Sequence, residues 1–268
     1  MSDPGEAETK NWIEVQDELK KRLVTEDDFT WKLPSQIEKE EEEEDGALLK
    51  YVGGVDISFS KEDPSIACGC LIVLQLKTQQ IVYQDLCLLR LQVPYVPGFL
   101  AFREAPVLLQ LLDNMKKNAN PFYPQVIVII HVNRYCWLMA MDCSILEARF
   151  GLACHLGVLA NLPTIGIGKN LHHVDGLTHS TVRQLLQAKE NSNGNIITLT
   201  GASGFTWGVA MKSTEDTPKP IFISIGHRIS LDSAIMIVKM TCKYRVPEPI
   251  RQADIRSRDY LQKHQMGQ

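Results

Sequence analysis

The sequence contains no hydrophobic run long enough to cross a bilayer. Apolar runs such as Val126–Ile130 fall far short of the ~20 residues that a membrane helix needs, and the polar, acidic segment Met1–Lys10 has no apolar signal core. An excess of positive charge is also lacking, since 28 Lys and Arg residues stand against 32 Asp and Glu residues, a net charge of −4. We therefore expect no membrane partner, and any anion-binding surface must be local.

Paired cysteines are scarce as well. The seven cysteines are odd in number and scattered along the chain, which fits reduced thiols inside the cell rather than a disulfide framework. Cys68 and Cys70 are two residues apart on one face of a predicted strand. We interpret them as packing residues rather than zinc ligands, because no second Cys/His pair has the spacing of a zinc site.

Hydrophobic periodicity predicts an α/β protein with one main domain. The predicted helices are Asn11–Leu23, Gly98–Lys117, Gly151–Leu159 and Leu231–Thr241. The predicted strands are Tyr51–Ser58, Ala67–Leu76, Ile81–Leu91, Val126–Ile130, Thr164–Ile167, Phe205–Met211 and Pro220–Ile225. Short turns predict an antiparallel meander for the first three strands, and the apolar run at 126–130 fits a strand buried on both faces.

This order of elements resembles the ribonuclease H-like layout, a central mixed sheet with an antiparallel meander followed by parallel strands and flanking helices. We expect a flexible N-terminus at residues 1–10, one domain at 11–262 and a C-terminal tail at 263–268. Within the domain, the run Glu38–Asp45 is almost wholly acidic. Like charges repel one another, so residues 38–46 are predicted to form a solvated loop.

Two carboxylates have unusual surroundings in the sequence. Asp56 lies within the apolar segment Val52–Phe59, where a charge is costly to bury unless it is paired or bound to a metal. The adjacent Gly53 and Gly54 permit another backbone to approach closely. The alternative is an exposed position on an alternating strand. Glu104 is the second carboxylate, and it lies in the segment Pro94–Pro106.

The segment Pro94–Pro106 contains three prolines and one glycine around several aromatic residues. Prolines on both sides of Tyr95 stiffen its backbone, as a residue that takes the place of a displaced base would require. The alternative is a rigid loop that caps the sheet.

Six segments together resemble the endonuclease V family, and they lie in the family's order over about Trp12 to Leu261. They are Tyr51–Phe59, Pro94–Pro106, Gly151–Val158, Ile165–Lys169, Gly226–Leu231 and Pro247–Arg258. The resemblance implies a ribonuclease H-like fold and an endonuclease that uses Mg²⁺, with Mn²⁺ able to substitute, to cleave 3′ of a hypoxanthine base. It implies inosine-containing single-stranded RNA as the partner of animal members, and deoxyinosine in DNA as that of bacterial members.

The resemblance also assigns catalytic roles. Asp56 and Glu104 resemble the metal-binding carboxylates, and metal ions in such a site activate water and stabilise the leaving oxygen. Lys169 resembles a cation near the scissile phosphate. His227 resembles an active-site histidine that handles a proton or contacts phosphate.

Nucleic-acid contacts follow from the same resemblance. Tyr95 resembles a wedge that fills the gap left by the displaced inosine, within a segment that includes Pro94, Pro97 and Gly98. Arg251, Arg256 and Arg258 are candidates for contacts with backbone phosphates, with surface ion pairs as the alternative. We further expect a monomer in the cytoplasm and the nucleus, including the nucleolus.

One family motif is missing. The family carries Val-Asp-Gly-Asn-Gly followed by His-Pro-Arg-Gly, and counting from the matched flank at Pro124 puts that aspartate at Ile130. The segment Ile129–Arg149 matches nothing in the family. Codons that encode Trp137–Ile145 can also be read, from the third base of the Trp137 codon, as Val-Asp-Gly-Asn-Gly-Leu-Leu-His. We therefore hypothesise that this segment is translated out of frame, either through an error in the gene model or in a splice variant.

The missing aspartate predicts a chain that is inactive or nearly so. Asp142 is the nearest carboxylate in the sequence, but catalytic ligands must be held within about half an ångström of productive geometry. Two readings of function follow: a metal-dependent endonuclease, or a non-catalytic protein that binds inosine-containing nucleic acid. A purely structural protein would leave the pair Asp56 and Glu104 unexplained.

Overall fold

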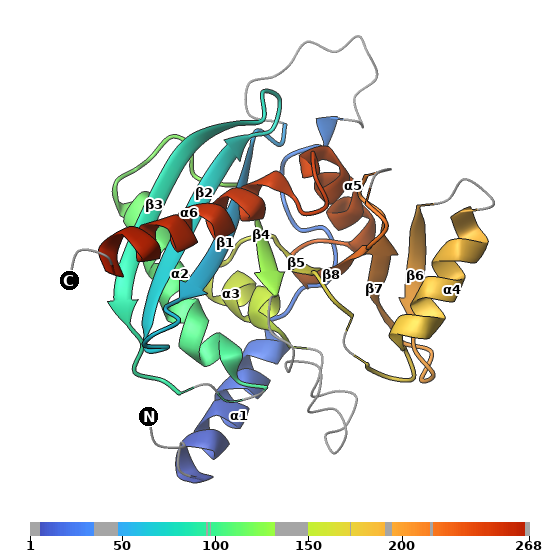
Figure 1. Cartoon of the computed structure of the whole chain (residues 1–268), viewed down its shortest axis with the longest axis horizontal. Coiled ribbons are helices and arrows are strands. Elements are labelled where there is room, and N and C mark those ends of the chain that lie inside the picture. The colour runs from blue at the N-terminus through green and yellow to red at the C-terminus, as the bar shows by residue number, and fades with distance from the viewer. Residues whose placement is uncertain are drawn as a thin grey trace.

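A mixed sheet organises the computed structural model, which describes residues 6–34, 48–94, 96, 98–131, 150–171, 173–190, 195–214 and 217–265. Its strands are β1 (Tyr51–Phe59), β2 (Ile66–Gln75), β3 (Gln80–Arg90), β4 (Val126–His131), β5 (Thr164–Gly168), β6 (Ile196–Thr200), β7 (Thr206–Met211) and β8 (Ile221–His227). Over these described residues the strand order is β3-β2-β1-β4-β5-β8-β7-β6 (Figure 1). The central strands β1, β4 and β5 are parallel, and the strands on either side are antiparallel. The predicted meander and mixed sheet are confirmed.

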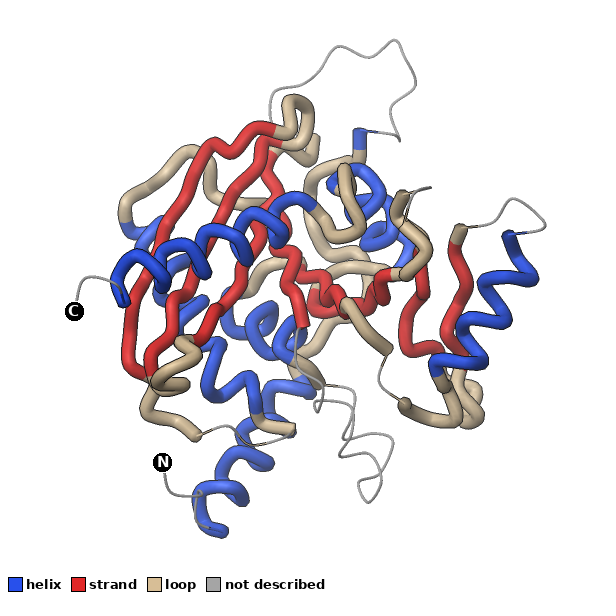
Figure 2. The backbone as a smooth tube through the Cα atoms, viewed as in Figure 1, coloured by secondary structure: helices blue, strands red, loops and turns tan. Residues whose placement is uncertain are grey.

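Helices cover both faces of this sheet, as the backbone trace shows (Figure 2). They are α1 (Glu6–Lys21), α2 (Leu100–Lys117), α3 (Leu152–Ala160), α4 (His179–Glu190), α5 (Leu231–Thr241) and α6 (Glu248–Gln265). One core joins α2 and α3 to the sheet through Leu108, Leu156 and Ile127. Another joins α5 and α6 to the opposite face through Ile237 and Ile250. None of the helices described is both long and apolar enough to cross a membrane.

Strand β4 lies between these two cores. Successive side chains of a strand point to opposite faces. Accordingly, Ile127 and Ile129 belong to the core under α2 and α3, whereas Val128 and Ile130 belong to the core under α5 and α6. The predicted strand buried on both faces is confirmed, and it continues to His131, which pairs with Gly168 of β5.

Helix α6 crosses the outer face of β1 and β2 (Figure 1). Gly54 permits this approach, because a Cβ atom there would lie 2.3 Å from the carbonyl carbon of Pro249. Two turns further along α6, the hydroxyl groups of Ser58 and Ser257 form a hydrogen bond of 2.7 Å. Residues 54, 56 and 58 share one face of β1. Asp56 therefore faces α6 between these two contacts.

Several elements differ from the prediction. Helix α1 begins at Glu6, so residues 6–10 are helical rather than part of a flexible terminus, and α6 continues through residues 263–265 of the predicted tail. Helices α4 and α6 and strand β6 were not predicted. Beyond the first two residues of α6, the buried positions are few and partly small or polar, and the charged residues between them obscure the helical period. These positions are Ile250, Ala253, Ser257 and Leu261. The predicted acidic loop at 38–46 lies outside the described residues.

The close contact at Gly54 gives a test of how α6 is held. Gly54→Ala should lower the free energy of unfolding by about 1–3 kcal/mol, because the added methyl group meets the backbone of α6 rather than a flexible side chain. Urea denaturation measures the effect. Gly151→Ala is the matched control, because φ there is −89° and nothing lies within 4 Å of an added Cβ. Equal stability of the two variants would show that α6 does not pack against β1 in this way.

Candidate active site

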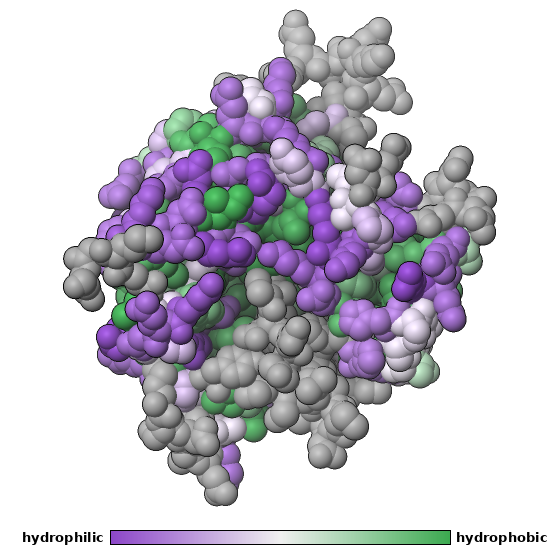
Figure 3. All heavy atoms as spheres, in the orientation of Figure 1, coloured by the Kyte–Doolittle hydropathy of each residue, from purple (hydrophilic) through white to green (hydrophobic). Residues whose placement is uncertain are grey.

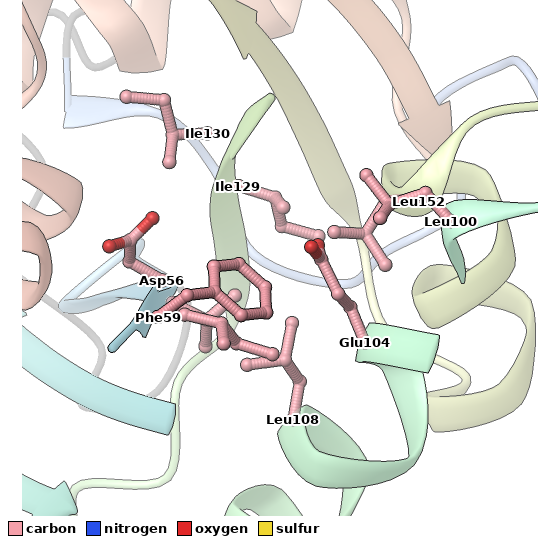
Figure 4. A pocket seen from close by; sticks show the side chains of 10 residues that line it. Asp56, Phe59, Leu100, Glu104, Leu108, Ile129, Ile130 and Leu152 are labelled. Carbon is pink, nitrogen blue, oxygen red and sulfur yellow. The ribbon is translucent and has the colours of Figure 1, made fainter. Parts of the chain in front are cut away.

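A pocket opens between β1, β4, α2 and the start of α3. Its lining is hydrophobic, from residues such as Phe59, Ile129 and Leu152, apart from the two carboxylates of Asp56 and Glu104. Figure 4 shows these carboxylates on opposite sides of Ile129, Asp56 extending from β1 and Glu104 from α2. The structure therefore brings the two predicted metal-binding residues to one pocket.

Both carboxylates are strongly desolvated. Asp56 is 5% exposed and Glu104 is 8% exposed. Burial raises the pKa of Asp56 to about 7, with a further contribution from the negative charge of Asp254. Burial also raises the pKa of Glu104 to about 8, and the charge of Asp56 adds to this shift. Near neutral pH the pocket thus favours protonated carboxyl groups, and a bound cation would reverse that preference.

Asp254 is the third acidic residue of this region. It lies on α6, which faces Asp56, and its carboxylate accepts from the ammonium group of Lys169 at 3.2 Å and from the guanidinium of Arg258. The positive charges of Lys169 and Arg258 in turn lower the pKa of Asp56. Residues from β1, α6 and the end of β5 therefore form one electrostatic cluster, Asp56, Asp254, Lys169 and Arg258.

Asp254 is not among the site residues predicted from the sequence. Its motif, Pro247–Arg258, was recognised, but only the arginines were considered as functional residues. In the sequence, Asp254 is marked only by the small residue Ala253 before it, which the structure shows to be buried. That signal becomes meaningful only once α6 is known to cross β1 at Asp56.

Ile130 occupies the position where the missing aspartate was predicted. It is 4% exposed and lines the pocket with Asp56. The β1–β4 register pairs Val55 with Ile129, so Ile130 is one step along from that pair, level with Asp56. Figure 4 shows its side chain on the Asp56 side of the strand. An apolar side chain thus stands where a carboxylate would adjoin Asp56.

The structure does not bring His227 to the pocket. His227 pairs with Thr164, the first residue of β5, whereas Lys169 follows the last residue of that strand. The Nδ1 atom of His227 accepts a hydrogen bond from the backbone N–H of Val24 at 3.2 Å, and the side chain of His227 is buried. Burial lowers its pKa. We expect this histidine to fix the N-terminal segment onto the sheet rather than to transfer a proton.

The structure describes some of the residues that were predicted to contact nucleic acid. Gly98 has φ +85°, which favours glycine, and it lies with Pro94 in the segment that leads into α2. Tyr95 and Pro97 lie outside the described residues. The guanidinium of Arg251 donates two hydrogen bonds to Glu248, at 2.7 and 2.8 Å, and lies 4.4 Å from the ring centroid of Tyr244.

Two of the three arginines of α6, Arg251 and Arg258, form ion pairs, which were the alternative predicted from the sequence. Arg251 pairs with Glu248, Arg258 pairs with Asp254, and Arg256 donates to Gln84. These pairs lie on the face that α6 crosses, where the surface along the helix is mainly hydrophilic (Figure 3). Contact with phosphate would require Arg251 or Arg258 to exchange a carboxylate partner for the phosphate.

The donor set suits a hard cation, although it is incomplete. Carboxylate oxygens are the ligands that Mg²⁺ prefers, and Asp56 and Glu104 are buried with raised pKa values. Among the described residues, however, no three His, Cys, Asp or Glu side chains gather closely enough to hold a metal ion. The residues present could hold a divalent cation through two carboxylates, without a third carboxylate ligand.

The raised pKa of Glu104 predicts a specific pH dependence. Because the pKa is raised in the folded protein, the stability gained from the neutral carboxyl group is lost as the pH rises from about 4.5 to about 8. Glu104→Gln should therefore gain stability relative to the parent between pH 6 and pH 9, on the order of 1–3 kcal/mol. Urea denaturation across this range measures the gain. Glu14→Gln, at an exposed position of α1, is the control, and an equal gain there would contradict the prediction.

Comparison with known proteins gives consistent matches over almost the whole chain. A family model described as Endonuclease V matches residues 31–255. Mouse Endonuclease V is 39% identical over 261 residues, which cover 97% of this chain and 71% of the mouse protein. The catalytic domain of human Endonuclease V is 35% identical, with a TM-score of 0.80 and coverage of 97% of this chain and 98% of that domain.

A structure from Ciona intestinalis adds a ligand to the comparison. It is an Endonuclease V in complex with a 23mer DNA that contains an inosine followed by a ribo-adenosine, and it is 30% identical, with a TM-score of 0.80 over 97% of this chain and 99% of that chain. The similarity supports the ribonuclease H-like arrangement predicted from the sequence. With a family model and relatives that span nearly its whole length, the chain belongs to the Endonuclease V family of nucleic-acid endonucleases.

Proposed function

We propose that this chain is a metal-dependent endonuclease that binds inosine-containing single-stranded nucleic acid, with RNA preferred over DNA, at the pocket that contains Asp56 and Glu104, and hydrolyses a phosphodiester bond 3′ of the inosine. The observation that carries the proposal is the burial of these two carboxylates in one pocket, beside Asp254 and Lys169. The inosine-containing DNA bound by the Ciona intestinalis relative supports the base specificity. The preference for RNA depends on contacts with the 2′-hydroxyl group, which the experiment below tests.

Mg²⁺ is the cation that we propose for this site, with Mn²⁺ as a substitute. Asp56 and Glu104 would hold it, and Asp254 would add negative charge beside Asp56. A divalent cation in such a site supplies an activated water and stabilises the leaving oxygen. The two carboxyl groups must lose their protons to bind it, so affinity for the cation should rise between pH 6 and pH 8.

The chain's own residues would orient the nucleic acid. Lys169 is 26% exposed at the end of β5, and its ammonium group is within reach of a phosphate beside the pocket. It already pairs with Asp254, so binding of phosphate would place a second anion on the same ammonium group. The hydrophobic lining around Glu104 would limit the access of bulk water to the reacting group.

Cleavage by this chain should be slow, because Ile130 stands beside Asp56 where an aspartate is expected. Removal of a partner in the outer shell of a metal site alone costs roughly 10–100-fold in affinity or activity. The absence of a ligand should cost at least as much. The second candidate function, recognition of inosine without cleavage, follows from the same observation.

A single assay separates the two candidates. The parent chain is mixed with a labelled single-stranded RNA that contains one inosine, in the presence of Mg²⁺, and both binding and cleavage are measured. We expect binding tighter than to the same RNA with adenosine or to the deoxyinosine DNA. Cleavage should be at least about 100-fold slower than by a version in which the two missing motifs replace residues 129–149. Equal binding of the three nucleic acids would refute the specificity, and equal cleavage rates would refute the loss of activity.

The role of position 130 has its own test. Ile130→Asp should bind Mn²⁺ at least about tenfold more tightly than the parent, because it adds an oxygen donor beside Asp56. Isothermal titration calorimetry at pH 8 measures the affinity. Ile130→Asn is the matched control, since it has nearly the same shape as Asp without the charge. If the Asp and Asn variants bind Mn²⁺ equally, position 130 does not complete the site.

A further inference from the structure

Arg245 is a cation that the proposed function does not use. It lies between α5 and α6, and its guanidinium donates to three backbone carbonyl groups. The Nε atom donates to the carbonyl of Lys219 at 3.2 Å, and Nη2 donates to the carbonyl of Pro220 at 2.9 Å and to that of Lys169. The segment before β8, the α5–α6 connection and the end of β5 therefore meet at one side chain.

The contact with Lys169 links Arg245 to the candidate site. The same residue whose carbonyl accepts from Arg245 extends its ammonium group to Asp254 at 3.2 Å. Asp254 in turn contributes to the electrostatics of Asp56. Because Lys169 follows the last residue of β5, no strand pairing on β5 fixes its backbone, and Arg245 provides that anchor. We propose that Arg245 is a positioning residue that holds Lys169 in place to receive a phosphate of the nucleic acid.

The chemistry of the guanidinium group suits this role. It is planar and presents its donors in a fixed fork, so one arginine can satisfy several carbonyl groups at set angles. The backbone carbonyl of Arg245 accepts from the hydroxyl group of Ser213 at 2.7 Å, which fixes the other end of the residue. A lysine at this position has the same charge but only a compact ammonium group, and it cannot bond the carbonyls of Lys169, Pro220 and Lys219 in the same geometry.

This inference rests on the proposed binding of nucleic acid, and its test uses the full chain and the labelled inosine RNA. Binding is measured at several salt concentrations for the parent, Lys169→Ala, Arg245→Gln and the double variant. Each phosphate contact contributes about 0.7 to the salt dependence of single-strand binding. Lys169→Ala should lower the slope by about that amount and weaken binding by roughly tenfold at low salt.

If Arg245 acts through Lys169, Arg245→Gln should lower the slope by a similar amount. The double variant should then bind no more weakly than Lys169→Ala alone. Arg245→Lys should bind RNA as weakly as Arg245→Gln, because the fixed fork of guanidinium donors is lost even though the positive charge remains. Independent, additive losses in the double variant would overturn the inference, as would full binding by Arg245→Lys.

Arg228 provides the matched control for a merely structural effect. Its guanidinium also donates to backbone carbonyls, those of Asp28 at 2.9 Å and Asn161 at 3.4 Å, and it follows His227 at the other end of β5. Arg228→Gln should lower the melting temperature and leave the salt slope of RNA binding unchanged. A changed slope in Arg228→Gln would show that the assay reports stability, which overturns the inference. If the parent does not bind the RNA at all, the proposed function fails before Arg245 is tested.

Discussion

Asp56 is buried in the middle of β1 beneath α6, and a carboxylate in that position must be protonated, paired with a cation or bound to a metal. The surroundings of Asp56 bear on each of these three states. Burial raises its pKa to about 7, Lys169 and Arg258 supply positive charge, and the pocket beside it is where we propose that a divalent cation binds. The positive charges of Lys169 and Arg258 reduce the cost of burying this carboxylate in its charged form.

The geometry around Asp56 depends on close packing at two anchors. Gly54 and the Ser58–Ser257 hydrogen bond hold α6 across β1, which brings Asp254 to the same face as Asp56. On the other side, Arg245 ties the end of β5 to two neighbouring segments, and this fixes Lys169. Ile130 adds an apolar side chain to this polar arrangement, at the position where the resemblance to the family predicts an aspartate.

The central strands and the two pocket carboxylates could be predicted, because apolar runs such as 126–130 and a charge within an apolar strand are visible without the fold. Helix α6 could not, since its buried positions include Ala253 and Ser257, which carry little hydrophobic signal. Asp254 was missed with it. His227 was identified from a motif, but a motif does not give a residue's position in the fold. Only the strand register shows that His227 lies at the far end of β5 from Lys169. Counting from a matched flank predicts the missing aspartate at position 130, and β4 continues through that position to His131.

The anomalous scattering of Mn²⁺, in crystals of the chain grown near pH 8, tests most directly whether a cation binds beside Asp56. We expect a manganese peak within roughly 2.0–2.3 Å of the Asp56 carboxylate, the coordination distance of such oxygen ligands, with Glu104 on its other side. Manganese found only at other carboxylates, with none beside Asp56, would contradict the claim that this buried carboxylate marks a cation site.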